Sequence, residues 1–109
     1  MGKEHSSMIY PYKGHYQYNE TVIGNWDSSA IGVYYCGYAN SDNKLTILYV
    51  GKGVGENGIR GRLLDHIRDE NWPDVTHFGY QLCDYASEAE KWEADEIKTY
   101  KPKYNEQGK

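Results

Sequence analysis

The fold is decided by residues 31–50, which read IGVYYCGYANSDNKLTILYV. Ile31–Tyr38 and Leu45–Val50 are rich in β-branched and aromatic residues, a composition typical of strands. Residues 39–44 between them are turn-like, so the stretch predicts an antiparallel β-hairpin. Because side chains alternate between the two faces of a strand, we expect two sets of residues each to share a face: Tyr34, Cys36 and Tyr38 on the first strand, and Leu45, Ile47 and Tyr49 on the second.

Two helices and a third strand are predicted after the hairpin. A glycine-rich loop over residues 51–58 leads into a helix at about Ile59–Arg68, which carries apolar residues at helical spacing. Residues 76–84 form the predicted third strand. A second helix is expected over residues 86–100, because Pro102 cannot continue it.

Glu93 lies in the middle of what should be the buried stripe of the second helix, whose other members are Ala86, Ala89, Ile97 and Tyr100. Burying an unpaired charge costs several kcal/mol in effective terms. We therefore expect the Glu93 carboxylate to face a metal, a cation or a water-filled cleft. At the start of the same helix, Ser87 and Glu90 match a capping box.

Basic residues cluster between Lys52 and Arg68, with Arg60 and Arg62 between them. Arg62 and His66 are four residues apart, so they stack on one side of the first helix, at the edge of its apolar stripe. For a single basic residue, a solvated position on a helix surface is the simpler reading. The pair nevertheless marks the place where a cleft would lie.

Length and composition limit the classes of protein to consider. At 109 residues the chain should form one domain, and its formal charge of −4 argues against indiscriminate binding to nucleic acid. No apolar run approaches the roughly 20 residues that span a bilayer, and residues 1–7 lack the core of a signal peptide. We therefore expect an intracellular, cytoplasmic protein without membrane association. Cys36 and Cys83 lack partners at zinc spacing and should be reduced thiols.

The predicted fold class is α+β, with a small three-stranded antiparallel sheet flanked by helices. Residues 1–30 contain four tyrosines and a tryptophan without a clear period. We expect them to form an irregular aromatic extension that packs on a domain covering residues 31–109.

In order and approximate spacing, five short motifs along the chain resemble those of the GIY-YIG nuclease family. The motifs are Gly32-Val33-Tyr34, Tyr49-Val50-Gly51, Arg62 with His66, Glu93 and Asn105. Each motif is weak alone, whereas five in the right order and structural context are fairly specific. The resemblance covers about residues 31–106 and implies a metal-dependent endonuclease that hydrolyses phosphodiester bonds in DNA.

The resemblance also implies roles for individual residues. Glu93 would hold Mg²⁺, with Mn²⁺ as an alternative, and Arg62 would clamp the scissile phosphate. Tyr34, more than Tyr49 or His66, would take the proton from the attacking water, with nearby positive charge favouring its phenolate. The predicted substrate-binding residues are Lys52, Arg60 and Asn105.

Two other readings remain open. Residues 53–58 match GxGxxG between a strand and a helix, but a dinucleotide site needs a parallel βαβ unit rather than an antiparallel hairpin. Alternatively, the domain has the GIY-YIG-like fold without activity and serves as a nucleic-acid or protein interaction module. The acidic net charge favours this second reading, unless a targeting domain, a partner protein or a homodimer mate supplies DNA binding. Asn105 could also simply brace the chain after Pro102.

Overall fold

The computed structural model describes residues 9–26, 29–70 and 72–107. Its elements in chain order are β2 (Lys13–Gln17), α1 (Glu20–Gly24), β3 (Gly32–Ala39), β4 (Leu45–Gly53), α2 (Gly58–Asp69), β5 (His77–Leu82), α3 (Ala86–Tyr100) and α4 (Lys103–Gln107). The predicted α+β class, hairpin, third strand and two long helices are therefore confirmed. Lys52 lies on strand β4, because the second hairpin strand continues three residues into the glycine-rich segment.

The sheet has four strands, in the order β2-β5-β3-β4, and every pairing is antiparallel. The prediction of three strands was wrong because β2 comes from the N-terminal extension and pairs with β5. The extension is therefore not irregular throughout, since it contributes β2 and the short helix α1. The strand sequence Lys13-Gly14-His15-Tyr16-Gln17 does not alternate apolar with polar residues, so it shows no clear strand period.

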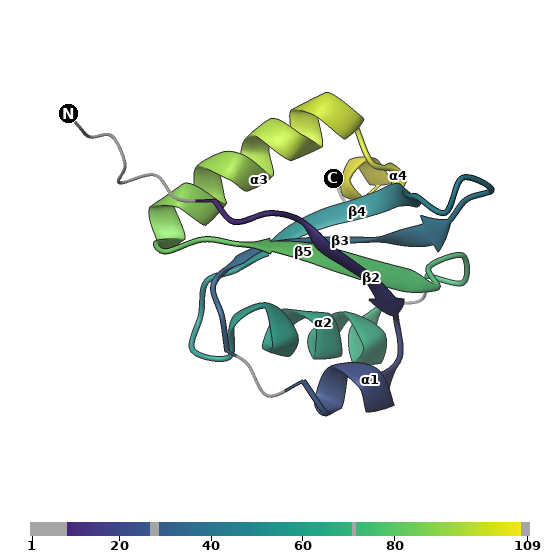
Figure 1. Cartoon of the computed structure of the whole chain (residues 1–109), viewed down its shortest axis with the longest axis horizontal. Helices are drawn as coiled ribbons and strands as arrows, with labels where there is room; N and C mark the ends of the chain where they lie inside the picture. Colours follow the sequence, from purple (N-terminus) through teal and green to yellow (C-terminus); the bar gives the residue numbers. More distant parts are fainter. Residues whose placement is uncertain (1–8, 27–28, 71, 108–109) are drawn as a thin grey trace.

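Helices cover both faces of this sheet (Figure 1). Helices α1 and α2 lie below it in this view and α3 lies above it, while α4 follows α3 and lies next to β4. Because β4 is an edge strand, side chains from the helices on opposite faces can meet at its outer side. This edge brings the candidate site together.

A β-bulge divides strand β4 into two halves, and the alternation of side chains between the two faces of the sheet shifts by one residue at the bulge. Cys36 pairs with Tyr49, but Gly37 pairs with Ile47, so one extra residue, Leu48, is accommodated between them. Tyr49 therefore packs on the α2 side, whereas Leu45 and Ile47 pack on the α3 side. The prediction that all three share a face was wrong, because a bulge shifts a period of two by one residue.

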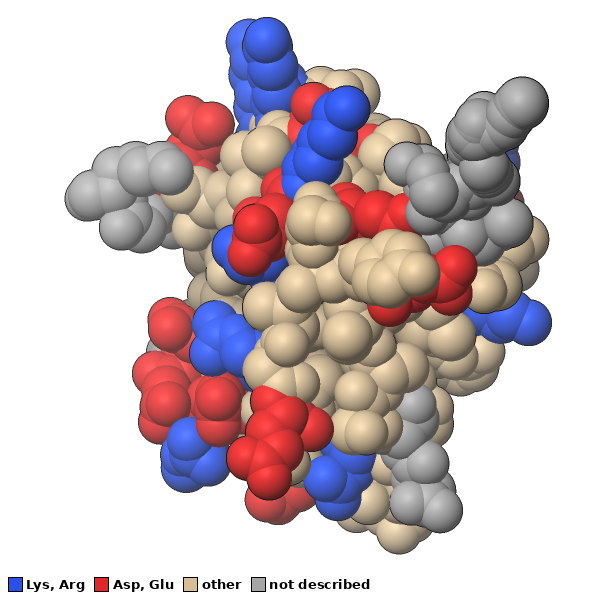
Figure 2. Space-filling view, turned by 90° about the vertical axis from the view of Figure 1, so that its left-hand side faces the viewer, with Lys and Arg blue, Asp and Glu red and all other residues tan. Residues whose placement is uncertain are grey.

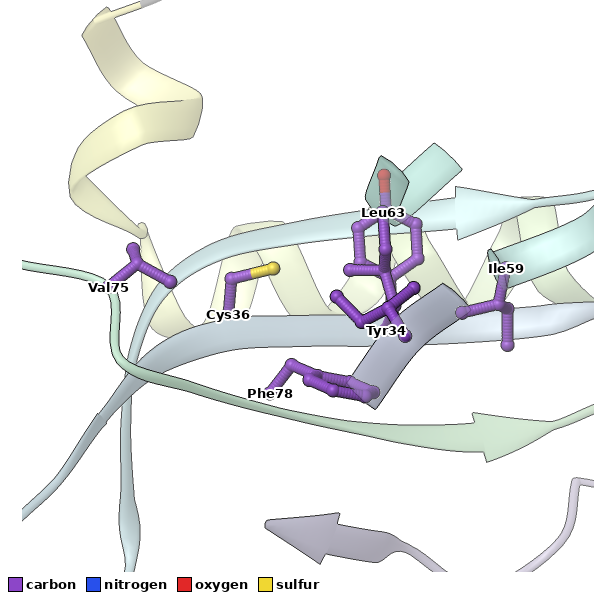
Figure 3. Packing of buried hydrophobic residues seen from close by; sticks show 7 residues of the cluster. Tyr34, Cys36, Ile59, Leu63, Val75 and Phe78 are labelled. Carbon is purple, nitrogen blue, oxygen red and sulfur yellow. The ribbon is translucent and has the colours of Figure 1, made fainter. Parts of the chain in front are cut away.

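Each face of the sheet has its own hydrophobic core. On the α2 side, Tyr34 packs among Ile59, Leu63 and Phe78, as Figure 3 shows. On the α3 side, the buried residues are Val33, Tyr35, Val50, Cys83 and Ala89. Cys36 belongs to the first core and Cys83 to the second, and both are free thiols, as expected.

The ends of α3 follow from local interactions. The Glu88 carboxylate accepts hydrogen bonds from the backbone N–H groups of Asp84 and Tyr85, at 3.1 Å each. The N-cap is therefore Tyr85, two residues before the Ser87 of the predicted Ser87 and Glu90 capping box, and that prediction was wrong. At the other end, Lys101 adopts a left-handed conformation with φ of 46°, and Pro102 follows.

Among the residues that the structure describes, no helix is both long and apolar enough to cross a bilayer.

Candidate active site

A tyrosine and a histidine form the buried centre of the candidate site. The Tyr34 hydroxyl lies 2.6 Å from Nε2 of His66, within hydrogen-bonding distance. Tyr34 is fully buried and His66 is 5% exposed. The two residues come from β3 and α2, so the packing of α2 on the sheet brings them together.

Aromatic rings surround the His66 imidazole. Its centroid lies 4.9 Å from that of Tyr49 and 4.8 Å from that of Trp72. Trp72 also stacks on Tyr104 of α4, at 5.3 Å. Trp72 and Tyr104 were missed at the sequence level. The dipeptide Trp72-Pro73 directly after the helix is the signal that could have indicated a large ring at its end.

The glycine of the second motif has a steric role. A Cβ atom on Gly51 would lie 2.4 Å from both the hydroxyl oxygen and Cζ of Tyr34. The Tyr34 ring therefore covers the backbone of β4 at a position where any other residue would displace it. This close approach explains why a tyrosine on β3 requires a glycine at the paired position of β4.

Burial dominates the acid–base properties of this centre. Burial raises the pKa of the Tyr34 phenol well above its ordinary value; Tyr49 and Cys36 add to the effect, and the Arg62 guanidinium opposes it. Burial and the Arg62 charge together lower the pKa of His66 from 6.5 to about 4. Arg62 favours the phenolate, as expected from the sequence, but desolvation outweighs its charge and the pKa of Tyr34 is raised. Both groups are neutral at pH 7.

Tyr49 is only half-buried and forms the outer part of the same group. Its ring lies 6.1 Å from that of Tyr34. Burial raises the pKa of the Tyr49 phenol, Arg62 opposes the shift, Glu93 adds to it, and hydrogen bonding with Tyr34 opposes it. Tyr49 thus interacts with the Tyr34 hydroxyl and, electrostatically, with the charged side chains of Arg62 and Glu93.

Arg62 lies close to both phenols and reaches solvent. Partial burial disfavours its charge, but Tyr34, Tyr49 and Asp65 raise its pKa above the ordinary value. Its side chain is 47% exposed, forms a long ion pair with Asp65 at 3.5 Å and hydrogen-bonds with Tyr34. The guanidinium is therefore positioned beside the tyrosines with most of its hydrogen-bonding capacity available to a ligand.

Glu93 faces a cation, as its place on the helix predicted. Its Oε1 atom lies 3.4 Å from Nζ of Lys52 on β4. The Glu93 side chain is 19% exposed and that of Lys52 is 36% exposed, so water reaches the pair. Glu93 is also near enough to affect Tyr34 and Tyr49 electrostatically. The Glu93 carboxylate therefore lies within electrostatic range of the aromatic residues, beside Lys52 of edge strand β4.

Asn105 braces the edge of the sheet. Its side-chain carbonyl accepts a hydrogen bond from the Val50 N–H at 2.8 Å, and its amide donates to the Val50 carbonyl at 2.9 Å. These bonds satisfy outward-facing backbone groups of edge strand β4. Asn105 thus has the bracing role that was the alternative at the sequence level, and its predicted contact with substrate stays a prediction.

Arg60 points toward helix α1. Its guanidinium donates to the carbonyl of Gly24 at 2.9 Å, which connects α1 to α2. Arg60 also lines a cavity of about 360 Å³ beside Arg62 and Arg68. The predicted role of Arg60 in binding substrate is therefore compatible with its position, though one of its nitrogens has a structural partner.

A single carboxylate is the available metal ligand at this site. Among the residues described, no group of three or more histidine, cysteine, aspartate or glutamate side chains could hold an ion. Glu93 alone nevertheless fits Mg²⁺, which retains several waters and binds through one or two carboxylates together with substrate phosphate oxygens. The nearby Lys52 ammonium would have to give way, and at 3.4 Å between partly exposed groups this ion pair is weak.

Charges of both signs are mixed on the face that Figure 2 shows. Lysine and arginine side chains alternate with acidic ones around an uncharged central area, and no continuous basic stripe is visible there. Binding of DNA on this face would therefore not be driven by a general positive potential.

No family model, curated protein or solved structure matches this chain.

Proposed function

We propose that this protein is a GIY-YIG-type, metal-dependent endonuclease that hydrolyses phosphodiester bonds in DNA. The observation that carries the proposal is the convergence, at the edge of β4, of the Tyr34, Tyr49 and His66 cluster with Arg62 and Glu93. These five residues come from four elements and include a cation, a carboxylate and three proton-carrying groups. Phosphodiester hydrolysis requires all three kinds of group.

Arg62 would bind the scissile phosphate. A guanidinium presents a planar fork of donors that matches two phosphate oxygens. The exposure of Arg62 and its weak pairing with Asp65 support this role, because little interaction is lost when a phosphate replaces the carboxylate. The same charge would then neutralise the additional negative charge of the transition state.

Glu93 would hold the divalent ion, with water and substrate oxygens as the remaining ligands. The ion, when bound, supplies positive charge beside the phosphate and lowers the pKa of coordinated water. Lys52, displaced from Glu93, would remain beside the phosphate as a second cation. The substrate phosphate would therefore replace the Glu93 carboxylate as the ion-pair partner of Lys52.

Tyr49 is the better placed of the two tyrosines to meet the attacking water. Tyr34 is fully buried and its hydroxyl is bonded to His66, whereas Tyr49 is half-buried and within electrostatic range of Arg62 and Glu93. Tyr49 would accept a proton from water and release its own to Tyr34, which would pass its proton to Nε2 of His66. The neutral imidazole has a lone pair on Nε2 for this proton, but because its pKa is lowered to about 4, the negative charge of the bound phosphate would have to stabilise the imidazolium.

The decisive experiment is a cleavage assay with Glu93→Gln and Glu90→Gln. Both changes remove one negative charge from α3, but Glu90 is exposed whereas Glu93 is partly buried beside Lys52. Supercoiled, branched and single-stranded DNA would be incubated with Mg²⁺, Mn²⁺ or EDTA. We expect metal-dependent cleavage by the wild type and Glu90→Gln and none by Glu93→Gln. Equal cleavage by both variants would eliminate Glu93 as the metal ligand.

A second candidate function is that of an interaction module without catalysis. The net charge of −4 and the mixed charges on the face in Figure 2 favour it, because neither feature promotes binding to a polyanion. DNA or protein binding that is unaffected by EDTA, with no cleavage of any DNA tested, would support this function in place of the nuclease.

A further inference from the structure

A second pocket lies on the opposite face of the sheet, under α3. It has a volume of about 290 Å³, and its lining residues include Tyr12, Tyr35, Tyr100, Glu96 and Lys44. None of these residues contributes to the candidate active site. Three phenol rings and a carboxylate around one small cavity are the chemical elements of a site for an organic cation.

The Glu96 carboxylate at this pocket is not fully satisfied by hydrogen-bond donors. The Tyr35 hydroxyl lies 2.7 Å from Oε1 of Gln81 and 2.7 Å from Oε1 of Glu96, but a phenol has one proton to donate. The Trp92 N–H is directed to Tyr35 and Gln81 and not to Glu96. Among the residues described, the Tyr35 hydroxyl is therefore the one donor directed at Glu96, and the carboxylate keeps free lone pairs beside the cavity.

The Tyr12 ring fills the space that the absence of a side chain at Gly79 and Gly14 leaves open. A Cβ atom on Gly79 would lie 2.0 Å from the Tyr12 hydroxyl oxygen, and one on Gly14 would lie 2.6 Å from it. The ring thus lies directly over the backbone of β5 and packs edge-on against Tyr35, with centroids 5.8 Å apart. Its hydroxyl also lies 3.3 Å from Nδ1 of His15. The Tyr12 ring therefore forms a fixed wall of the pocket and is not a mobile side chain on the surface.

We propose that this pocket binds a methylated ammonium group. Such a cation is attracted to the faces of tyrosine rings and to a carboxylate, and it gives up its weak hydration at little cost. The negative net charge of the protein also favours a cationic ligand. Lys44, which lies at the rim, is the cation already present and competes with the ligand for the same negative potential.

The test is a titration of the protein with choline and with 3,3-dimethyl-1-butanol, its uncharged analogue of the same shape, followed by NMR. We expect saturable shifts of residues around the pocket with choline, at millimolar affinity, and none with the alcohol. A peptide containing trimethyl-lysine, compared with its unmodified form, distinguishes a protein ligand from a small molecule. Equal responses to choline and the alcohol, or no response to any ammonium compound, would overturn the proposal.

Glu96→Gln, Lys44→Ala and the control Glu90→Gln complete the experiment. Glutamine at position 96 can still accept the Tyr35 hydrogen bond, so the fold should persist and can be checked by circular dichroism. We expect Glu96→Gln to weaken choline binding on the order of tenfold, Glu90→Gln to leave it unchanged and Lys44→Ala to strengthen it. Unchanged binding in Glu96→Gln would contradict the proposal. Binding that appears only in Lys44→Ala would also contradict it, because Lys44 would then occupy the pocket itself.

Discussion

The Tyr34 hydroxyl and Nε2 of His66 lie 2.6 Å apart inside the α2 side of the core, where both residues are almost inaccessible to water. A polar pair in such a place is stabilising only while both members are present, because each satisfies the other. The pair therefore links the stability of the fold to the chemistry of the candidate site.

Tyr34→Phe should reduce both stability and activity. The change leaves the buried His66 nitrogen without its partner, so we expect a loss of about 1–3 kcal/mol in the free energy of unfolding. The proposed proton relay would also be broken. Tyr38→Phe is the control, because Tyr38 lies on the same strand and is 40% exposed. Urea titration and the cleavage assay measure the two effects, and equal stability of both variants would contradict the first.

Stability should depend on pH through His66. Its pKa is lowered by burial and by Arg62 from 6.5 to about 4, so between these values the unfolded chain binds a proton that the folded chain does not. The free energy of unfolding should therefore fall as the pH is lowered through this window, by up to about 3 kcal/mol from this group.

The contribution of His66 is isolated by comparison with His66→Gln. The difference in stability between wild type and variant should shrink as the pH falls from neutral to about 4. Carboxylates titrate in both proteins and cancel in the difference. A difference independent of pH would show that His66 does not have a lowered pKa.

Gly51→Ala should be much more damaging than Gly55→Ala. A methyl group at position 51 would lie 2.4 Å from the Tyr34 hydroxyl, whereas one at position 55 meets no atom within 4 Å. We expect the first change to cost about 1–3 kcal/mol or more through overpacking and the second to be nearly neutral. Thermal unfolding of the two proteins tests this, and similar melting temperatures would refute the close contact.

Asn105→Ala should destabilise the edge of the sheet. The change removes two hydrogen bonds to the backbone of Val50, so a loss of about 1–3 kcal/mol is expected. Glu106→Ala, at an exposed position in the same short helix, is the control. Hydrogen exchange at the Val50 amide reports the loss locally, and unchanged protection in Asn105→Ala would contradict the bracing role.

Lys52→Gln should strengthen metal binding. The Lys52 ammonium lies 3.4 Å from the carboxylate that we propose as the metal ligand, so its removal eliminates a competing cation. We expect tighter Mn²⁺ binding, measured by electron paramagnetic resonance without DNA, and a lower rate of cleavage. Lys91→Gln, an exposed change of the same charge on α3, should alter neither property. Weaker Mn²⁺ binding in Lys52→Gln would contradict the competition.

Sequence patterns predicted the parts of the fold that depend on neighbouring residues. The hairpin follows from two β-rich segments around a polar turn, and α3 ends where Pro102 requires. The fourth strand was not predictable in this way. Lys13–Gln17 has a weak strand pattern of its own, and its pairing with β5, more than sixty residues away, is decided by the edge that β5 offers.

In the candidate site, too, some features were predictable from the sequence and others depended on the tertiary structure. The sequence by itself suggested the resemblance that groups Tyr34, Tyr49, Arg62, His66 and Glu93, and it predicted that Glu93 faces a metal, a cation or water. Only the tertiary structure decided that the cation is Lys52, that the amide of Asn105 is bonded to Val50, and that burial outweighs Arg62 at Tyr34. The reason is physical: periodicity fixes which face a side chain occupies, whereas its partners and its solvation depend on elements distant in the chain.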